Sequence, residues 1–155
     1  MIVTQRLRLE ALDRSTAEAI VAGERGGRAW HPDFPRLDDR GAARGFLGHG
    51  DETFGCLLIV DAATGLAVGT IGFFGPPDNG GLVMIGYGLV EPARGAGYAT
   101  EAVRAVIAYA FAHDGVRTIA AETLLGNTAS QRVLAKSGFA LNETADGTCY
   151  FSLDR

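Results

Sequence analysis

Cysteine, lysine and long apolar runs are scarce in this sequence of 155 residues. The two cysteines, Cys56 and Cys149, lie far apart, so they form neither a disulfide framework nor a metal-ligand spacing, and two reduced thiols are favoured over a bridge between them. No run of about 18 apolar residues exists, so we expect no membrane span. The N-terminus also lacks the apolar segment of a signal peptide. A reducing, cytoplasmic setting is therefore the default expectation.

A large excess of charge is absent as well. The net charge is -4, with 47% hydrophobic and 21% charged residues. These values are typical of a globular protein and give no support to a general nucleic-acid or membrane-surface binder. The length fits one domain over residues 1–155 with a single core. We expect a monomer or a homodimer and no metal site.

The apolar periodicity predicts an α+β fold with a mixed, mostly antiparallel central sheet flanked by helices. The helix after the first strand would begin at Asp13 or Ser15 and stop at Gly23. A strand–helix–strand unit over residues 82–123 predicts one right-handed parallel crossover. Expected strands cover 6–10, 53–62, 66–75, 82–90, 116–124, 139–144 and 148–153; expected helices end near 22, 50, 113 and 137.

The segment EPARGAGYATEAV, residues 91–103, places very small side chains at the start of a helix. A helix N-terminus offers unpaired N–H groups and a partial positive charge, which suits phosphate. Gly95, Ala96, Gly97 and Ala99 leave that backbone bare, and Arg94 adds a charge that can pair with phosphate. A strand-to-helix turn that simply needs glycine torsions is the alternative explanation. No Gly-Lys-Ser/Thr follows, and the third glycine of a dinucleotide fingerprint is missing.

Two blocks of sequence carry a family resemblance. Arg94-x-x-Gly97-x-Ala99 resembles the acetyl-CoA pyrophosphate loop of the GNAT superfamily of N-acetyltransferases. The string RGAGYATEAV (94–103), together with NTASQRVLAKSGF (127–139), is similar to the RimJ/RimL-like branch, which acetylates the N-termini of ribosomal proteins. The IGYGL segment and the opening TQRLRLEAL fit the same branch.

The resemblance implies a coenzyme site between two strands that separate at their ends. Exposed backbone groups of Leu89 and Val90 would pair with the pantetheine arm of acetyl-CoA, and the loop would hold the pyrophosphate. The amine would attack the thioester directly, so no nucleophilic triad is expected. The implied coenzyme-binding residues are Leu89, Val90, Arg94, Gly95, Ala96, Gly97, Tyr98, Ala99, Asn127 and Ser130.

The catalytic residues depart from the family pattern. Many members place a tyrosine acid where this chain has Leu134, and a glutamate where it has Met84. Ser130 stands where the branch has a serine that contacts the thiol, although a serine in the first turn of a helix is also an ordinary local cap. Glu122, on a strand beside the gap, is our preferred general base, with a water chain as the alternative.

The acceptor side is predicted from the loop WHPDFP. In this superfamily that region shapes the acceptor pocket, so Trp30 and Phe34 would wall it and His31 or Asp33 would bind the amine. The alternative is a loop held down by an aromatic plug. The resemblance favours a protein N-terminal α-amine as acceptor; a small amine such as an amino acid, polyamine or antibiotic stays open. Two other classes also stay open, a CoA-binding regulatory module without turnover and a nucleotide-binding domain.

Overall fold

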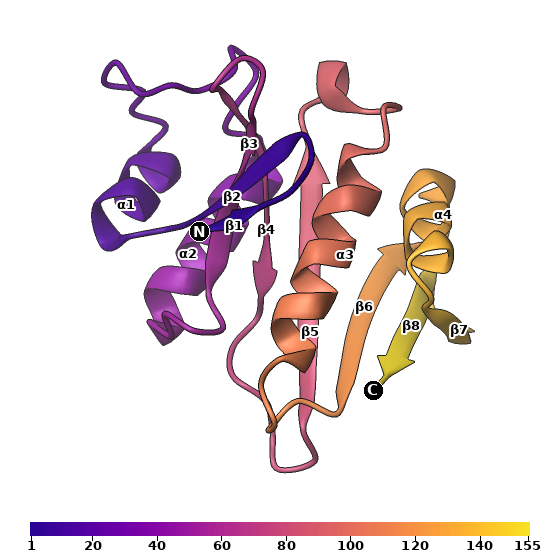
Figure 1. The fold of residues 1–155 in the computed structure, drawn as a ribbon. Helices are drawn as coiled ribbons and strands as arrows, with labels where there is room; N and C mark the ends of the chain where they lie inside the picture. The colour runs from indigo at the N-terminus through magenta and orange to yellow at the C-terminus, as the bar shows by residue number, and fades with distance from the viewer.

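The computed structural model describes residues 1–155 and contains one eight-stranded sheet beside four α-helices (Figure 1). The strands lie side by side in the order β1-β2-β3-β4-β5-β6-β8-β7. Their bounds are β1 Ile2–Val3, β2 Leu7–Ala11, β3 Cys56–Asp61, β4 Ala67–Phe73, β5 Leu82–Leu89, β6 Thr118–Leu124, β7 Ala140–Ala145 and β8 Thr148–Asp154. The predicted α+β class is confirmed, and the short β1 is an additional strand.

The helices begin and end close to where the sequence predicts them. They are α1 Arg14–Ala22, α2 Leu37–His49, α3 Tyr98–Phe111 and α4 Thr128–Lys136, with a 3-10 turn at Glu91–Ala93. Of the two predicted caps for α1, Asp13 is correct: its carboxylate accepts the Thr16 N–H at 2.7 Å. Gly23 closes α1 in the left-handed conformation, which glycine adopts without steric strain.

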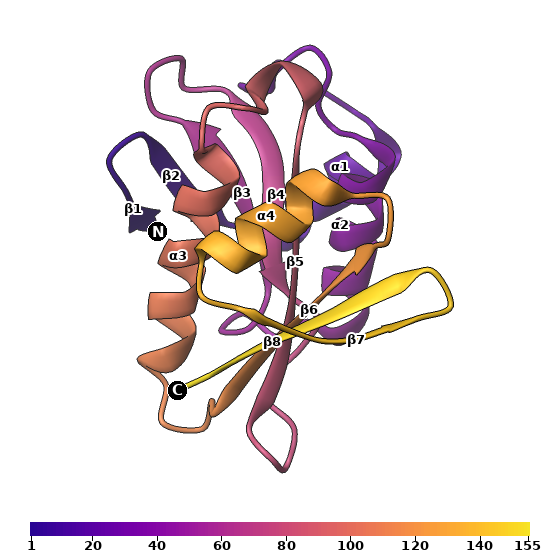
Figure 2. The ribbon, with the colours of Figure 1, turned by 90° about the vertical axis from the view of Figure 1, so that its right-hand side faces the viewer.

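The helices cover both faces of the sheet. Helices α1 and α2 lie on one face and α3 lies on the other (Figure 2). Helix α4 packs against α3 and β6. Buried apolar side chains of the helices and of the sheet form one continuous cluster. Because strand residues alternate between the faces, odd-numbered residues of β5 face α3 and α4, whereas even-numbered ones face α2.

One parallel pair, β5 with β6, interrupts an otherwise antiparallel sheet. Helix α3 makes the crossover between them, as the sequence predicts. The pairing runs only from Leu82 opposite Thr118 to Ile85 opposite Ala121. Residues 86–89 of β5 and 122–124 of β6 continue as strands without pairing with each other. The two strands therefore separate at their carboxyl ends, and we call this opening the β5–β6 gap.

Candidate active site

The loop between β5 and α3 presents a bare backbone at the mouth of the gap. Gly95 and Gly97 have φ values of 81° and 84°, a conformation that a side chain would strain. Residues 94–97 are exposed. No hydrogen bond within the protein uses the backbone N–H groups of residues 95–100. Six donors thus lie at the positive end of a 14-residue helix, an arrangement that fits an anionic diphosphate.

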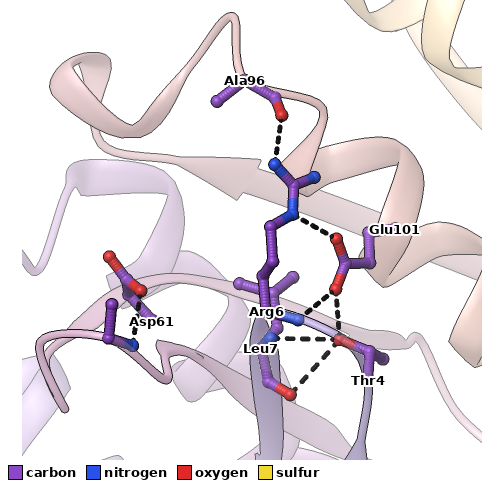
Figure 3. Close-up of polar contacts among 7 residues, drawn as sticks. Thr4, Arg6, Leu7, Asp61, Ala96 and Glu101 are labelled. Atoms are coloured by element: carbon purple, nitrogen blue, oxygen red, sulfur yellow. Dashed lines mark hydrogen bonds and ion pairs between the residues drawn. The ribbon is translucent and has the colours of Figure 1, made fainter.

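A clamp from the N-terminal strands fixes this loop (Figure 3). Glu101 of α3 accepts hydrogen bonds from the Thr4 hydroxyl at 2.6 Å, the Arg6 backbone N–H at 2.7 Å and the Arg6 Nε at 2.8 Å. Arg6 Nη1 donates to the Ala96 carbonyl at 2.7 Å, and its guanidinium stacks 4.6 Å from the centre of the Tyr98 ring. Tyr98 and Glu101 thus hold the loop through Arg6, a role that the sequence did not suggest.

The electrostatics of the clamp keep Glu101 ionised. Partial burial alone would raise the pKa of this carboxyl, but the hydrogen bonds from Thr4 and Arg6 and the charge of Arg6 outweigh it. The net result is a pKa below the ordinary value of glutamate. Glu101 is therefore a structural anion, and its lowered pKa makes it a weak base for proton transfer.

Backbone groups of β5 point into the gap. Phe74 donates to the Met84 carbonyl and Val90 to the Val68 carbonyl, so even-numbered residues of β5 bond to β4. Because bonded and non-bonded pairs alternate in an antiparallel ladder, the groups of Tyr87 and Leu89 face β6 instead. The predicted backbone contacts of Leu89 and Val90 with the pantetheine arm therefore differ in whether the backbone groups are available. Leu89 faces the gap, whereas both backbone groups of Val90 are already used, its N–H by Val68 and its carbonyl by the Ala93 N–H.

Arg94 lies at the edge of the same opening. Its side chain is exposed and its Nε donates to the Leu89 carbonyl at 3.0 Å. That bond directs the guanidinium along the loop and leaves its terminal nitrogens without a partner in the protein. Since the Leu89 carbonyl is occupied, the N–H is the only backbone group that Leu89 can offer within the gap.

A tyrosine–serine pair spans the gap between β5 and α4. The Tyr87 hydroxyl lies 2.7 Å from Ser130 Oγ and donates to the Ser130 carbonyl at 3.2 Å. Burial raises the pKa of Tyr87, against the smaller opposing effect of the bond to Ser130, so the phenol stays protonated. Asn127 caps α4 by accepting the Ser130 N–H at 3.1 Å. The sequence analysis did not select Tyr87 as a site residue, and only the fold reveals this contact.

Beyond the paired residues, β6 divides its side chains between the two faces. Ala121 lies beside Ile85, so Thr123 shares the α4 face while Glu122 points to the opposite face. Glu122 is exposed and forms no hydrogen bond or ion pair. Thr123 is buried, and its Oγ1 has no hydrogen-bond partner in the protein. An orphan hydroxyl beside an open gap is suited to a polar ligand.

The predicted acceptor residues do not line the main cavity of the protein. Trp30 and Phe34 are buried in the core, with ring centres 5.3 Å apart in an edge-on contact. Arg25 fastens the loop by donating to the carbonyls of Trp30, His31 and Phe34. The His31 ring accepts the Asp33 N–H, a local turn contact. The aromatic plug, the alternative raised from the sequence, describes this loop.

A cavity of about 480 Å³ lies instead between α2 and the strands β4 and β5. Its volume is within the range of roughly 300–1,000 Å³ that is typical of small-ligand sites. Phe46, Phe73 and Phe74 contribute apolar surface, and Gly86 and Tyr87 bring one end of the cavity to the β5–β6 gap. The residues that line this cavity are not among those that the sequence analysis selected for the acceptor.

A buried ion pair forms part of the wall of this cavity. Asp39 is fully buried; Arg36 reaches it through Nε at 3.0 Å and Nη2 at 2.7 Å, and the Thr70 hydroxyl donates to it at 2.7 Å. The guanidinium lies flat over Gly88, where a Cβ would come within 2.5 Å of it. Gly88 is therefore required by the close approach of Arg36 to the end of β5.

The cavity also contains one thiol. Burial, with a further contribution from the charge of Asp39, raises the pKa of Cys56 to about 12. A thiol in this state is protonated at neutral pH and is a poor nucleophile. Both cysteines are free and buried. Neither is arranged as a covalent catalyst.

A mixed sheet whose single parallel pair separates beside a bare helix N-terminus is the architecture of N-acetyltransferases. The comparisons with known proteins agree with that class. The family model described as "Acetyltransferase (GNAT) domain" matches residues 6–140. The protein described as "Uncharacterized N-acetyltransferase YjdG" of Bacillus subtilis (strain 168) is 30% identical over 152 residues, which cover 92% of this chain and 90% of that protein. The chain belongs to the GNAT acetyltransferase family and is an N-acetyltransferase.

Solved structures share the whole fold. The ribosomal-protein-S5-alanine acetyltransferase from Vibrio fischeri has a TM-score of 0.73 at 20% identity, covering 98% of this chain and 94% of that one. RimL, a ribosomal L7/L12 α-N-protein acetyltransferase in complex with coenzyme A, has a TM-score of 0.72 at 19% identity, covering 98% and 96%. At these identities, the likeness shows that the fold is shared.

Two further findings bear on the wider predictions. No group of three or more His, Cys, Asp or Glu side chains is arranged to hold a metal ion. None of the four helices combines the length and the apolarity needed to cross a bilayer.

Proposed function

We propose that this enzyme transfers the acetyl group of acetyl-CoA to a primary amine by direct attack, with the N-terminal α-amine of a protein or peptide as acceptor. The observation that supports it most strongly is the β5–β6 gap, which opens beside six unpaired N–H groups on one side and the cavity on the other. The acceptor rests on the branch resemblance, and the neighbours named above act on ribosomal proteins.

Binding of the coenzyme would use backbone donors above all. Residues 95–100 would donate N–H groups to the pyrophosphate, while Arg94 supplies a charge at the edge of the loop. The Thr123 hydroxyl, which is buried without a partner, would bond to a polar group of the pantetheine arm. Asn127 keeps α4 in place as its cap, and Ser130 stands at the far end of the gap.

The reaction forms a C–N bond and breaks the C–S bond of the thioester. The Leu89 N–H faces the gap and would polarise the acetyl carbonyl as charge develops on its oxygen. The acceptor ammonium must first lose a proton, and Glu122, on the acceptor face of β6, would take it directly or through water. Direct attack by the amine needs no acyl-enzyme. Cys56, which is held protonated, is also poorly suited to form one.

The leaving thiolate needs a proton donor, and the Tyr87–Ser130 pair is suited to provide it. Tyr87 stays protonated because burial raises its pKa, and Ser130 Oγ at 2.7 Å can pass a proton along the same hydrogen bond. The hydroxyl of Tyr87 would thus replace the family tyrosine that this chain lacks at Leu134. Positioned acids of this kind typically contribute about 10²- to 10⁴-fold to a rate.

A thiol-release assay with acetyl-CoA and a panel of peptides and small amines tests the proposal, with mass spectrometry to locate the acetyl group. We expect acetylation of peptide α-amines. Tight binding of acetyl-CoA in calorimetry without turnover on any amine would favour a regulatory module. Stabilisation by ATP or NAD in place of acetyl-CoA would favour a nucleotide-binding domain.

Two variants separate the proton-transfer roles. Tyr87→Phe should lower kcat by about tenfold or more while the Kd for acetyl-CoA changes little, because the ring remains and only the hydroxyl is lost. Glu122→Gln should lower kcat/KM by about tenfold or more while the Kd for acetyl-CoA changes little, because the amide cannot accept the proton of the ammonium. An unchanged kcat/KM would assign proton removal to water, and an unchanged kcat in Tyr87→Phe would remove this residue from the mechanism.

A further inference from the structure

The cavity beside α2 is hollow because of where its glycines lie. Gly41 and Gly45 stand one turn apart on α2, and both line the cavity. A Cβ added at either of them would meet no atom within 4 Å. On the opposite wall, Gly86 of β5 leaves the cavity open to the gap. Larger side chains at Gly41 and Gly45 would fit the fold but would occupy the space, whereas a Cβ at Gly86 would already lie 3.0 Å from the Phe74 ring.

The walls of the cavity carry no unsatisfied charge. Asp39 is bonded by Arg36, by Thr70 and by the Arg36 backbone N–H, so it has no capacity for another cation. Asp38, the other carboxylate, is 91% exposed at the rim. Phe46, Phe73 and Phe74 provide aromatic surface. A second ammonium group, as in a polyamine, would find no partner inside and would lose its hydration.

One donor does remain free at the end of the cavity next to the gap. Arg36 uses Nε and Nη2 for Asp39, whereas its Nη1 makes no hydrogen bond and lies 3.9 Å from Asp38. The same nitrogen lies above Gly88, adjacent to Leu89. Because Asp39 already balances the guanidinium and Asp38 is close, a neutral carbonyl oxygen is a better partner for Nη1 than a carboxylate.

We propose that this cavity binds the first residue of a peptide acceptor, with an uncharged aliphatic or aromatic side chain inside and its carbonyl oxygen on Arg36 Nη1. The proposal rests on the proposed function and narrows it to a class of N-termini. The α-amine is then held between the Arg36 site and the gap, where the Leu89 N–H lies. Acidic and basic first residues are excluded because their charges would be buried without partners.

The substrate side of the test uses a series of acceptors. Peptides that differ only in the first residue (Gly, Ala, Leu, Phe, Asp, Lys) are compared by kcat/KM, together with phenylalaninamide, free phenylalanine and 2-phenylethylamine. We expect the Leu and Phe peptides to exceed the Asp and Lys peptides by tenfold or more. Phenylalaninamide should exceed both free phenylalanine, which adds a carboxylate, and 2-phenylethylamine, which lacks the carbonyl oxygen.

The protein side of the test fills the cavity. Gly45→Leu should lower kcat/KM for the Leu and Phe peptides by tenfold or more and leave the Gly peptide nearly unchanged. Gly48→Leu is the matched control, because Gly48 lies on the same helix with open space around it but does not line the cavity. Leucine favours a helix over glycine, so both variants should fold, which thermal unfolding checks.

The outcomes distinguish this proposal from the proposed function. Equal rates for all first residues, or an equal effect of Gly45→Leu and Gly48→Leu, would overturn the cavity assignment while the transferase stands. If no amine is acetylated, calorimetry with phenylalaninamide in the presence of CoA decides. If phenylalaninamide binds to the parent protein but not to Gly45→Leu, the cavity assignment is supported although the transferase proposal fails. If it does not bind to the parent protein, both the cavity assignment and the transferase proposal are overturned.

Discussion

The two sides of the β5–β6 gap are built from different kinds of groups. On the coenzyme side, the donors are mostly backbone N–H groups of residues 95–100, exposed by small side chains and held by the Arg6–Glu101 clamp. On the proposed acceptor side, the surface is made of side chains from α2, β4 and β5, and the Arg36–Asp39 ion pair beside it is buried. Under the proposed function, the first side would bind by main-chain geometry, and the second would select by shape and charge.

The difference has a consequence for how each side responds to change. A backbone donor survives most substitutions, provided that the glycine torsions and the clamp are kept. A side-chain wall changes with each residue that lines it. We therefore expect the coenzyme site to tolerate sequence change and the acceptor site to determine specificity. Four substitutions test where the boundary between the two sides lies.

The largest expected effect concerns a residue that belongs to neither side. Trp30→Ala should lower the free energy of unfolding by about 3–5 kcal/mol, because it removes a buried ring that contacts Phe34. Urea denaturation measures it. At low temperature the folded variant should keep kcat/KM for its peptide within about twofold of the parent.

His31→Ala is the control for that experiment. His31 lies in the same loop but is only half-buried, so the expected change in unfolding free energy is within about 0.5 kcal/mol. A rise in KM for the acceptor peptide in either folded variant would show that the loop containing Trp30 and His31 contributes to the acceptor site.

The next effect tests the coenzyme side. Arg94→Ala removes a charge-assisted contact worth about 1.5–3 kcal/mol, so the Kd for acetyl-CoA should rise about 10- to 100-fold while kcat stays nearly constant. Calorimetry measures the Kd. Arg14→Ala is the control, because Arg14 is exposed on α1 and its one ion pair is with Glu18 of the same helix, away from the loop. Equal affinity in Arg94→Ala would remove this residue from the site.

These two sides also differ in how far the sequence predicts them. The torsions of Gly95 and Gly97 and the cap at Asn127 are local backbone features, which glycine spacing and cap residues encode within a few residues. Arg36, Thr70 and Gly86 meet only after α2 packs on the sheet, so no local pattern marks them. The strands and helices were predicted well because their periodicity is local too. The place of Trp30 could not be decided from sequence, because an aromatic loop is equally consistent with a pocket and with a core plug; the structure buries its ring.

The clamp gives a pH-dependent prediction of intermediate size. Since the pKa of Glu101 is lower in the folded chain, its stabilisation is present above the unfolded pKa near 4.5 and is lost as pH falls through the lower folded value. Glu101→Gln should therefore lower the free energy of unfolding at pH 7 by about 1–2 kcal/mol, with a difference that shrinks as pH falls below the unfolded pKa.

Denaturant midpoints across this pH range measure the difference. Glu91→Gln, at an exposed glutamate that makes no side-chain hydrogen bond or ion pair, is the control and should give a flat difference. A deficit in Glu101→Gln that persists unchanged at pH 3 would show that packing, and not the charge of Glu101, holds the loop.

The smallest effect tests whether the coenzyme side depends on the backbone alone. Thr123→Val replaces a buried hydroxyl that has no partner by a methyl group of similar shape. Without coenzyme the variant should be as stable as the parent or up to about 1 kcal/mol more stable, because an unsatisfied polar group is removed. With acetyl-CoA the order should reverse: Kd should rise by about three- to tenfold, since one hydrogen bond contributes about 0.5–1.5 kcal/mol. Thermal unfolding with and without acetyl-CoA measures both changes. An unchanged Kd would show that the Thr123 hydroxyl does not contact the coenzyme.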